Sequence, residues 1–405
     1  MNKKIYIIAT GMNGYDTMTT QALAKVQECE LLIGAKRMLA FFSDLEKECF
    51  VSYQYDEIRE KIQNSSYTKI GVLMSGDCGF FSGARKLTFL LEKYDVEIIC
   101  GIASPIYFCS KLKMKWEDMV FISLHGRNAN IIRNIARNEK TFFLLGGEIK
   151  AEHICKTMCD YGMENLKVHI GENLAMENER ILSDTAQNLQ NINTSVLCVM
   201  IVENPYHETY LKTNIPDSEF IRDKIPMTKS EIRSICVAKL NIESDDICWD
   251  IGCGTGSVAV EMAMQCFQGK VCAVDKNELA VSLTEQNKYK FQCDNIKIFL
   301  GEVTEIIPAL PMPDCVFIGG SSGKLEEIIR MIFARNPFVK IIVTAISLET
   351  LSQSISAFDK FGINTEITQI AVTRTKKIGT HTMLNAENPI FLIRNLSSTT
   401  YSCDN

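Results

Sequence analysis

Residues 250–256 read Asp250-Ile251-Gly252-Cys253-Gly254-Thr255-Gly256. They follow a short apolar run, Ile247–Trp249, and precede an amphipathic stretch, Val258–Cys266, so we expect a strand, a glycine loop and a helix in that order. Glycine tolerates positive φ and lets a ligand contact the backbone. The first turn of a helix adds unpaired N–H donors and a partial positive charge. The stretch therefore predicts a nucleoside-binding loop at the edge of a parallel sheet.

Two classes of cofactor use a loop of this kind. The dinucleotide fingerprint G-x-G-x-x-G would place its third glycine at position 257, where this chain has Ser257. The observed spacing is G-x-G-x-G led by Asp250, which is the pattern of methyltransferases that use S-adenosylmethionine, and an acid near the site suits a sulfonium cation. We favour that cofactor, and a nicotinamide-dependent reductase remains an alternative.

Acidic residues follow the next two expected strands. Asp275 closes the strand Val271–Val274, where a carboxylate can accept the two ribose hydroxyls of a nucleoside. Glu302 and Val303 follow the strand Ile296–Phe299 and are placed to line the adenine. Alone, Asp275 could equally be a strand-end cap, and the glycine loop upstream favours the binding role.

Short apolar runs alternate with amphipathic stretches along the whole chain, which is typical of α/β folds. The N-terminal half has the strand-like runs Ile5–Ala9, Ile70–Met74, Val96–Cys100, Thr141–Leu145 and Val196–Val202. The C-terminal half adds Cys315–Ile318 and Ile341–Val343 to the three runs above, alternating with helical stretches such as Leu325–Ala334, and predicts a doubly wound, mostly parallel, Rossmann-like sheet. Pro205 and Pro216 interrupt the pattern, so we predict domains at 1–210 and 222–396, a linker at 211–221 and a flexible tail at 397–405.

The bulk composition narrows the class of protein. The chain has 405 residues and a net charge of -6, which disfavours a nucleic acid as the main partner. Its 16 cysteines include no C-x-x-C pair, so we expect reduced, mostly buried thiols and no metal site, even at His153, Cys155 and Cys159. The apolar run near the N-terminus is too short for a signal segment or a membrane span. We expect a cytoplasmic protein without membrane contact.

The N-terminal half carries several loops of small residues, most of them directly after a strand-like run. Small residues there leave room for a ligand at the carboxyl edge of a sheet. Tight turns would explain any one of these loops, but several in register favour a second binding site. The loops are Gly11–Gly14, Ser75–Gly83, Gly101–Tyr107, Ser123–Arg127, Gly146–Glu148 and Gly171–Leu174.

Three strings in the C-terminal half carry a family resemblance. They are Ile225–Arg233 (Ile-Pro-Met-Thr-Lys-Ser-Glu-Ile-Arg), Val316–Ser321 (Val-Phe-Ile-Gly-Gly-Ser) and Ile342–Ala345 (Ile-Val-Thr-Ala). With the glycine loop, residues 222–395 resemble the cobalt-precorrin-6B C15-methyltransferase (decarboxylating) family. The resemblance implies that the cofactor contacts Thr228, Asp250, Gly252, Cys253, Gly254, Thr255, Gly256, Asp275, Glu302 and Val303.

Residues 3–206 resemble the tetrapyrrole methyltransferase superfamily, most closely its precorrin-7 C5-methyltransferase branch. The specific strings are Ser-Leu-His-Gly-Arg at 123–127 and Gly-Ile-Ala-Ser-Pro-Ile-Tyr at 101–107; Asn13 and Leu145 depart from the commoner Pro and Thr. The resemblance implies a fold of two α/β subdomains, with Arg127 meeting a substrate carboxylate. His125 is a candidate catalytic residue, although a structural role or a hydrogen bond to substrate is favoured. The implied cofactor residues are Gly11, Gly76, Asp77, Gly101 and Ser104.

The two halves in this order resemble the fused precorrin-6Y C5,15-methyltransferases (decarboxylating) of cobalamin biosynthesis. This implies methylation of C5 and C15 of a precorrin or cobalt-precorrin and loss of the C12 acetate carboxyl group. It also suggests a homo-oligomer, such as a tetramer through the C-terminal domain. Arg374, Lys376 and Lys377, with His381, form a possible site for substrate carboxylates, or else a solvated loop, and Arg374 and His381 are further candidate catalytic residues. A methyltransferase acting on RNA or protein is the alternative function.

Overall fold

The computed structural model describes residues 3–126 and 128–396, which form two compact units. Of the described residues, unit 1 comprises 3–126, 128, 139–156 and 164–204. Unit 2 comprises 129–138, 157–163 and 205–396. Two short segments of the N-terminal half thus belong to the C-terminal unit. The domain limits expected from the sequence stay a prediction, and the expected tail at 397–405 lies outside the described residues.

The first sheet of unit 1 has five parallel strands in the order β3-β2-β4-β1-β5. Alternate residues of its strands supply two cores, one shared with helices α3 and α4 and the other with α1 and α2. Parallel strands with apolar residues on both faces require helices on both sides of the sheet, which gives this layering. The elements are β1 (Lys4–Ala9), η1 (Gly14–Asp16), α1 (Thr20–Glu28), β2 (Leu31–Gly34), α2 (Lys36–Ala40), β3 (Glu48–Val51), α3 (Tyr55–Asn64), β4 (Lys69–Met74), α4 (Ala84–Leu90) and β5 (Asp95–Ile99).

The second sheet is mixed, with the order β6-β7-β10-β8-β9. Strands β6 and β7 are parallel, and β10 is antiparallel to both β7 and β8. Strands β6, β7 and β8 therefore end at one edge of the sheet, and β10 begins there. The elements are α5 (Ser104–Leu112), β6 (Val120–Ser123), α6 (Ile131–Arg137), β7 (Lys140–Leu144), α7 (Ala151–Asp160), β8 (Lys167–Glu172), β9 (Arg180–Thr185), α8 (Ala186–Leu189) and β10 (Cys198–Glu203).

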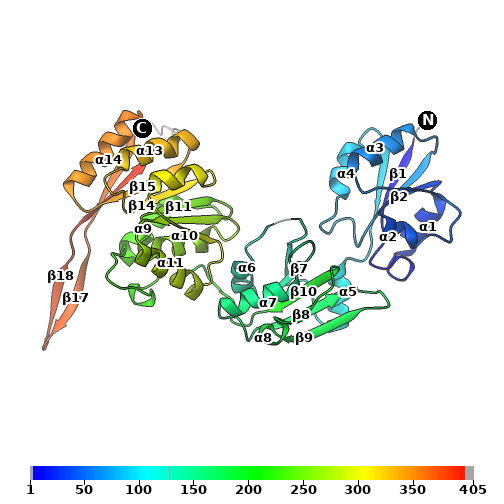
Figure 1. Ribbon diagram of the computed structural model, residues 1–405, viewed down its shortest axis with the longest axis horizontal. Helices are drawn as coiled ribbons and strands as arrows, with labels where there is room; N and C mark the ends of the chain where they lie inside the picture. Colours follow the sequence, from blue (N-terminus) through cyan, green and yellow to red (C-terminus); the bar gives the residue numbers. More distant parts are fainter. Residues whose placement is uncertain (1–2, 127, 397–405) are drawn as a thin grey trace, which may run out of the picture. The chain divides into compact units, whose positions relative to one another are not determined.

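Unit 2 is built on a seven-stranded sheet in the order β13-β12-β11-β14-β15-β19-β16. The first five strands are parallel, and β19 runs antiparallel to both its neighbours. Helices cover both faces, α9, α10 and α11 on one and α13 and α14 on the other (Figure 1). The chain leaves β11 toward β12 and β13 and then returns to β14 on the other side. This reversal opens a crevice at the carboxyl ends of β11 and β14.

The remaining elements complete unit 2. A hairpin of β17 and β18 extends from the sheet, and its residues are largely exposed (Figure 1). Ile215 and Phe220, from the expected linker, are buried in the core of this unit. The elements are η2 (Asp217–Glu219), α9 (Ser230–Leu240), β11 (Ile247–Ile251), α10 (Ser257–Gln265), β12 (Lys270–Asp275), α11 (Glu278–Lys290), β13 (Ile296–Leu300), α12 (Val303–Ile306), η3 (Ile307–Ala309), β14 (Cys315–Ile318), α13 (Leu325–Arg335), β15 (Lys340–Ala345), α14 (Leu348–Lys360), β16 (Thr365–Ile370), β17 (Thr373–Ile378), β18 (His381–Ala386) and β19 (Ile390–Asn395).

The predicted fold class is confirmed: both halves are α/β, and the C-terminal sheet is mostly parallel. Every strand expected from an apolar run is present. The sequence did not predict the shorter strands β2, β3 and β6, the more polar β8 and β9, or strands β16 to β19. Within the described residues, no helix combines the length and the apolar character needed to cross a membrane.

Candidate active sites

The carboxyl edge of the C-terminal sheet holds a cavity of about 260 Å³ at the crevice between β11 and β14. It is bordered by the glycine loop, the ends of β12, β13 and β14, and the segment before α9. The lining residues are Ile225, Pro226, Gly252, Gly254, Asp275, Lys276, Asn277, Ala280, Gly301, Glu302, Val303, Gly319, Gly320, Ser321, Ser322, Lys324 and Ile328.

The glycine loop keeps its shape because side chains are absent from it. Gly252 has φ of 72°, and a Cβ there would lie 2.8 Å from the backbone nitrogen of Gly320. Gly254 has φ of 57°, and its Cβ would lie 2.9 Å from the carbonyl oxygen of Pro226. Larger residues would therefore both strain the backbone and push apart the walls of the cavity.

Asp275 connects the loop to the end of β12. One carboxylate oxygen accepts from the backbone N–H of Gly254 at 3.0 Å, and the other accepts from that of Asn277 at 3.0 Å. The carboxylate thus lies on the cavity wall beside the loop. This is the position in which an acid can also receive ribose hydroxyls.

Asp250 is fully buried behind the loop and does not line the cavity. One of its oxygens accepts from the backbone N–H of Ala259 at 2.9 Å, near the start of α10, and the other has no hydrogen-bond partner among the described residues. Burial raises the pKa of Asp250 to about 7, with a smaller contribution from the charge of Asp275. Asp250 therefore braces the start of α10 and does not face the cavity.

Three charged side chains stand together on the cavity wall. Glu302 lies 3.4 Å from the Lys276 ammonium and 3.2 Å from the Lys324 ammonium. Hydrogen bonds from Lys324 and Lys276 lower the pKa of Glu302. The cavity thus has a charged but internally balanced wall.

Apart from Val303, the other predicted cofactor residues of this half stand behind the lining. Val303 lines the cavity, whereas Cys253 and Thr255 are buried, and the Cys253 thiol lies 3.4 Å from the Thr284 hydroxyl. Gly256 packs against Thr284, and the Thr228 carbonyl accepts from Arg233 at 2.8 Å. The lining residues that were not proposed from the sequence include Lys276 and Asn277, just after β12, and Ala280, Lys324 and Ile328, which lie in or next to the helices that follow β12 and β14.

The residues of this cavity fit a nucleoside carrying a sulfonium group. The bare Cα atoms of Gly252 and Gly254 leave a cradle that a Cβ would fill. Asp275 offers a carboxylate beside it, as a ribose requires, and Val303 and Ile328 offer apolar contacts for a purine. These roles at single residues remain predictions.

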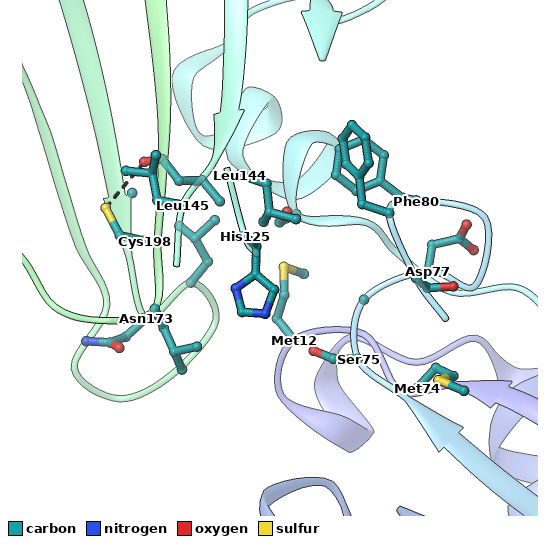
Figure 2. A pocket seen from close by; sticks show the side chains of 18 of the residues that line it. Met12, Met74, Ser75, Asp77, Phe80, His125, Leu144, Leu145, Asn173 and Cys198 are labelled. Atoms are coloured by element: carbon teal, nitrogen blue, oxygen red, sulfur yellow. Dashed lines mark hydrogen bonds between the residues drawn. The ribbon is translucent and has the colours of Figure 1, made fainter. Parts of the chain in front are cut away.

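Unit 1 has a cavity of about 350 Å³ between its two sheets (Figure 2). Loops after β1, β4 and β5 face loops from the second sheet across it. The lining residues are Met12, Arg37, Met74, Ser75, Gly76, Asp77, Phe80, Phe81, Ser82, Gly83, Ser104, His125, Leu144, Leu145, Gly171, Asn173, Leu174, Met176, Leu197, Cys198 and Val199.

The loops of the first sheet are joined by backbone bonds. Gly11 and Gly76 exchange two of them, at 3.1 Å and 2.7 Å. The Asp77 carboxylate accepts from the N–H groups of Gly79 at 2.7 Å and Gly101 at 2.8 Å. Gly76, Asp77 and Ser104 line the cavity, whereas Gly11 and Gly101 stand behind it and hold its wall.

His125 extends into the cavity from the loop after β6 (Figure 2). Its ring lies so close to Gly146 that a Cβ at that position would collide with it. The glycine after β7 therefore makes room for the imidazole. Arg127, the other candidate on this loop, lies outside the described residues.

Sequence reasoning missed Arg37, Met176 and residues 197–199 in this cavity. Arg37 follows β2, a strand that was not recognised, and Met176 lies in the turn between β8 and β9. Residues 197–199 open β10, which begins at this edge instead of ending there. A search confined to the ends of predicted strands could not find them.

The predicted basic cluster lies on the β17–β18 hairpin. Arg374 is already paired with the carboxylates of Glu231 and Glu387. Lys376 and His381 lie on the same face of the hairpin as Arg374, and Lys377 lies on the other, because residues alternate along a strand. None of the four lines either cavity. Their role in substrate binding stays a prediction.

Comparisons with known proteins assign both halves to families. Residues 4–190 match the family described as tetrapyrrole (corrin/porphyrin) methylases, and residues 218–395 match the precorrin methyltransferase domain. A protein of Saccharolobus solfataricus named probable cobalt-precorrin-6B C(15)-methyltransferase (decarboxylating) is 41% identical over 190 residues, covering 45% of this chain and 96% of that protein. A protein of Pyrobaculum calidifontis with the same name is 37% identical over 187 residues, covering 45% of this chain and 96% of its own length.

Among solved structures, the precorrin-6Y C5,15-methyltransferase of Geobacter metallireducens is similar to part of the chain. The identity is 33%, the match covers 46% of this chain and 97% of that one, and the TM-score is 0.44.

With these matches, the two loop-lined cavities define the protein as a methyltransferase with two domains, and the cofactor expected from the glycine loop, S-adenosylmethionine, is confirmed. The chain belongs to the cobalt-precorrin-6B C(15)-methyltransferase (decarboxylating) family, which its C-terminal half matches over nearly the whole length of the relatives. Both resemblances drawn from the sequence are thereby confirmed, and the alternatives of a nicotinamide reductase or an RNA or protein methyltransferase are disfavoured.

Proposed function

We propose that the chain methylates one corrin precursor at two positions, C5 in the N-terminal cavity and C15 in the C-terminal cavity, and removes the carboxyl group of the C12 acetate. The observation that carries this proposal is that one chain holds two cavities of different construction, each opening at loops of small residues. The family matches of the two halves support acting on one class of ring.

In the C-terminal cavity, the chain's task is to bind and orient. Gly252 and Gly254 would let the cofactor contact the backbone, Asp275 would receive the ribose and Val303 would line the adenine. When bound, S-adenosylmethionine supplies an electrophilic methyl group. The electron-rich ring carbon of a reduced tetrapyrrole can attack that methyl group without a strong base. Holding the two groups in line can contribute up to about 7–11 kcal/mol.

In the N-terminal cavity, apolar side chains would hold the flat ring and exclude water. Met12 and Phe80 come from two loops of the first sheet and Leu144 from the end of β7, and the three face the same space (Figure 2). Ser104 at the start of α5 and the wall held by Asp77 would border the cofactor. His125 reaches into this space and would contact the ring or one of its acid groups.

The test is mass spectrometry of the product made by the full chain from a purified corrin precursor and S-adenosylmethionine. The proposal expects two added methyl groups and one lost carbon dioxide. Titration with S-adenosylhomocysteine should find two sites per chain. A product with one methyl group, or binding of one equivalent, would contradict the two-site proposal.

Two further proposals concern the oligomeric state and the cellular location of the protein. We propose a homo-oligomer formed through the β17–β18 hairpin, because Ile378, Met383 and Leu384 are 58%, 51% and 77% exposed on it. Light scattering of the full chain and of a Leu384→Glu variant tests this, since a monomeric wild type would contradict it. A cytoplasmic location also remains our proposal.

A further inference from the structure

Arg37 occupies a position that the proposed function leaves without a role. It is the second residue of the short helix α2, which begins just after β2 at the carboxyl edge of the first sheet. This geometry places it on the wall of the N-terminal cavity, together with Ser75. The guanidinium Nη2 donates to the Ser75 hydroxyl at 3.2 Å, which directs the side chain along that wall.

The charge of Arg37 has no counterpart in the cavity. Among the described lining residues, Arg37 and Asp77 carry the only permanent charges. The Asp77 oxygens already accept backbone N–H groups from Gly79 and Gly101. Within the described residues, no carboxylate lies within ion-pair distance of Arg37. The cavity therefore has a satisfied anion and an unmatched cation.

The apolar surroundings of the Arg37 guanidinium favour pairing with an anion. Most of the lining is apolar, with Met12, Phe80, Leu145 and Val199 among its side chains. Although Arg37 as a residue is exposed, partial burial of its guanidinium lowers its pKa. A ligand that fills the cavity removes more water, and a guanidinium that loses water without an anionic partner is strongly destabilised. A carboxylate, which it can bind through two N–H groups, matches it in charge and shape.

We propose that Arg37 binds a carboxylate of the ligand held in the N-terminal cavity. This inference rests on the proposed function. The carboxylate is either an acid arm of the ring or the amino-acid carboxylate of the cofactor. Either source has the same chemistry, and the experiment below separates them.

The experiment measures C5 methylation by the full chain with Arg37→Gln, Arg37→Lys and Lys36→Gln. Lys36→Gln is the matched control, because Lys36 is exposed, precedes Arg37 in α2 and does not line the cavity. We expect Arg37→Gln to raise one KM by about 10- to 100-fold, the range for a hydrogen bond to a charged group. Arg37→Lys should recover part of the loss. An increased KM for the tetrapyrrole assigns the ring arm, and an increased KM for S-adenosylmethionine assigns the cofactor.

Two further measurements distinguish a failure of the Arg37 proposal from a failure of the proposed function. C15 methylation by the same variants reports that the chain is folded and should be unchanged. Binding of uroporphyrin III and of S-adenosylhomocysteine, followed by titration, needs no turnover. If the wild type makes no C5 product, the proposed function fails, while the titrations still decide the role of Arg37. Equal behaviour of Arg37→Gln and Lys36→Gln in both KM values and both titrations would overturn the inference.

Discussion

The two cavities are proposed to bind the same cofactor, but they are lined by different kinds of residue. The C-terminal cavity is lined by glycines and by charged side chains that neutralise each other, as Glu302 does with Lys276 and Lys324. The N-terminal cavity is mainly apolar and carries one unmatched cation, Arg37. The first is formed by the glycine loop, the ends of neighbouring strands of one sheet and the segment before α9, whereas the second is assembled from two sheets. A site that depends on backbone conformation leaves a glycine pattern that can be recognised in a sequence. A site formed by side chains from distant segments leaves no such pattern.

The buried ions behind the C-terminal cavity should give the largest effect. Arg233 is fully buried and pairs with Glu261 at 2.6 Å and Asp217 at 3.3 Å. Arg233→Met leaves Glu261 buried without its partner, so we expect the free energy of unfolding of unit 2 to fall by about 3–5 kcal/mol.

Urea unfolding in a Trp116→Phe background measures this change, because Trp249, buried in the core of unit 2, is then the remaining tryptophan. The double variant Arg233→Met, Glu261→Leu should recover much of the loss. The same variants in a Trp249→Phe background, where Trp116 reports on unit 1, should leave the unfolding of unit 1 unchanged, and an equal weakening there would show that the ions serve the whole chain.

The glycine cradle should separate the two activities. Gly252→Val places a β-branched residue at φ of 72° and sends its Cβ toward Gly320, so we expect C15 methylation to fall by at least about 100-fold. Binding of S-adenosylhomocysteine should drop from two equivalents to one, and C5 methylation should persist. Gly379→Val is the control, since it imposes similar strain at φ of 62° in open space on the hairpin. A parallel loss of both activities would contradict independent cavities.

Asp250 should make unit 2 sensitive to pH. Burial raises its pKa to about 7, above its value of about 4 in an unfolded chain. The folded protein therefore holds a proton that the unfolded chain releases, and stability falls as pH rises between about 4 and 7, by up to about 1.4 kcal/mol per unit.

Asp250→Asn removes this proton and should flatten that part of the profile. Urea unfolding at pH 5, 6, 7 and 8, followed through Trp249, measures the difference between the two profiles. Two superimposable profiles would mean that Asp250 is not protonated in the folded chain.

The smallest effect is expected at Asp77, where the N-terminal wall depends on one carboxylate. Asp77→Asn leaves a backbone N–H of Gly79 or Gly101 facing an NH₂ group, which should cost C5 methylation about tenfold. C15 methylation and the melting temperature of unit 2 should not change. Asp95→Asn, at the exposed start of β5, provides a control of equal charge. An unaffected C5 rate would show that the loop does not border the ligand.

The C-terminal site could be predicted from the sequence because its loop conformation requires glycine at defined positions. Gly252 and Gly254 were placed on the cavity wall from the spacing of the loop, because only glycine fits there. Asp275 was placed there from its position at the end of a strand. Asp250 belongs to the same motif, but its side chain turns away from the ligand toward α10. A motif therefore indicates the right segment without saying which side chains face the site.

The N-terminal site was only partly accessible to the same reasoning. Ser104 was found because it follows a recognised strand, and His125 because it belongs to the string at 123–127 that carries the family resemblance, although the strand before it, β6, was not recognised. Arg37 follows β2, a strand of four residues that resembles any short apolar run. Residues 197–199 were missed because the antiparallel β10 enters the cavity at its start, and strand direction is set by tertiary pairing that a single sequence does not reveal.

The thioethers of the N-terminal cavity have a consequence for the lifetime of the enzyme. Met12, Met74 and Met176 line this cavity, and no methionine is found among the described lining residues of the other. Peroxide converts such side chains into polar sulfoxides, which would wet a surface suited to a flat ring. Under oxidative stress the chain should lose C5 methylation first, and it would release a ring carrying only the modifications made in the C-terminal cavity.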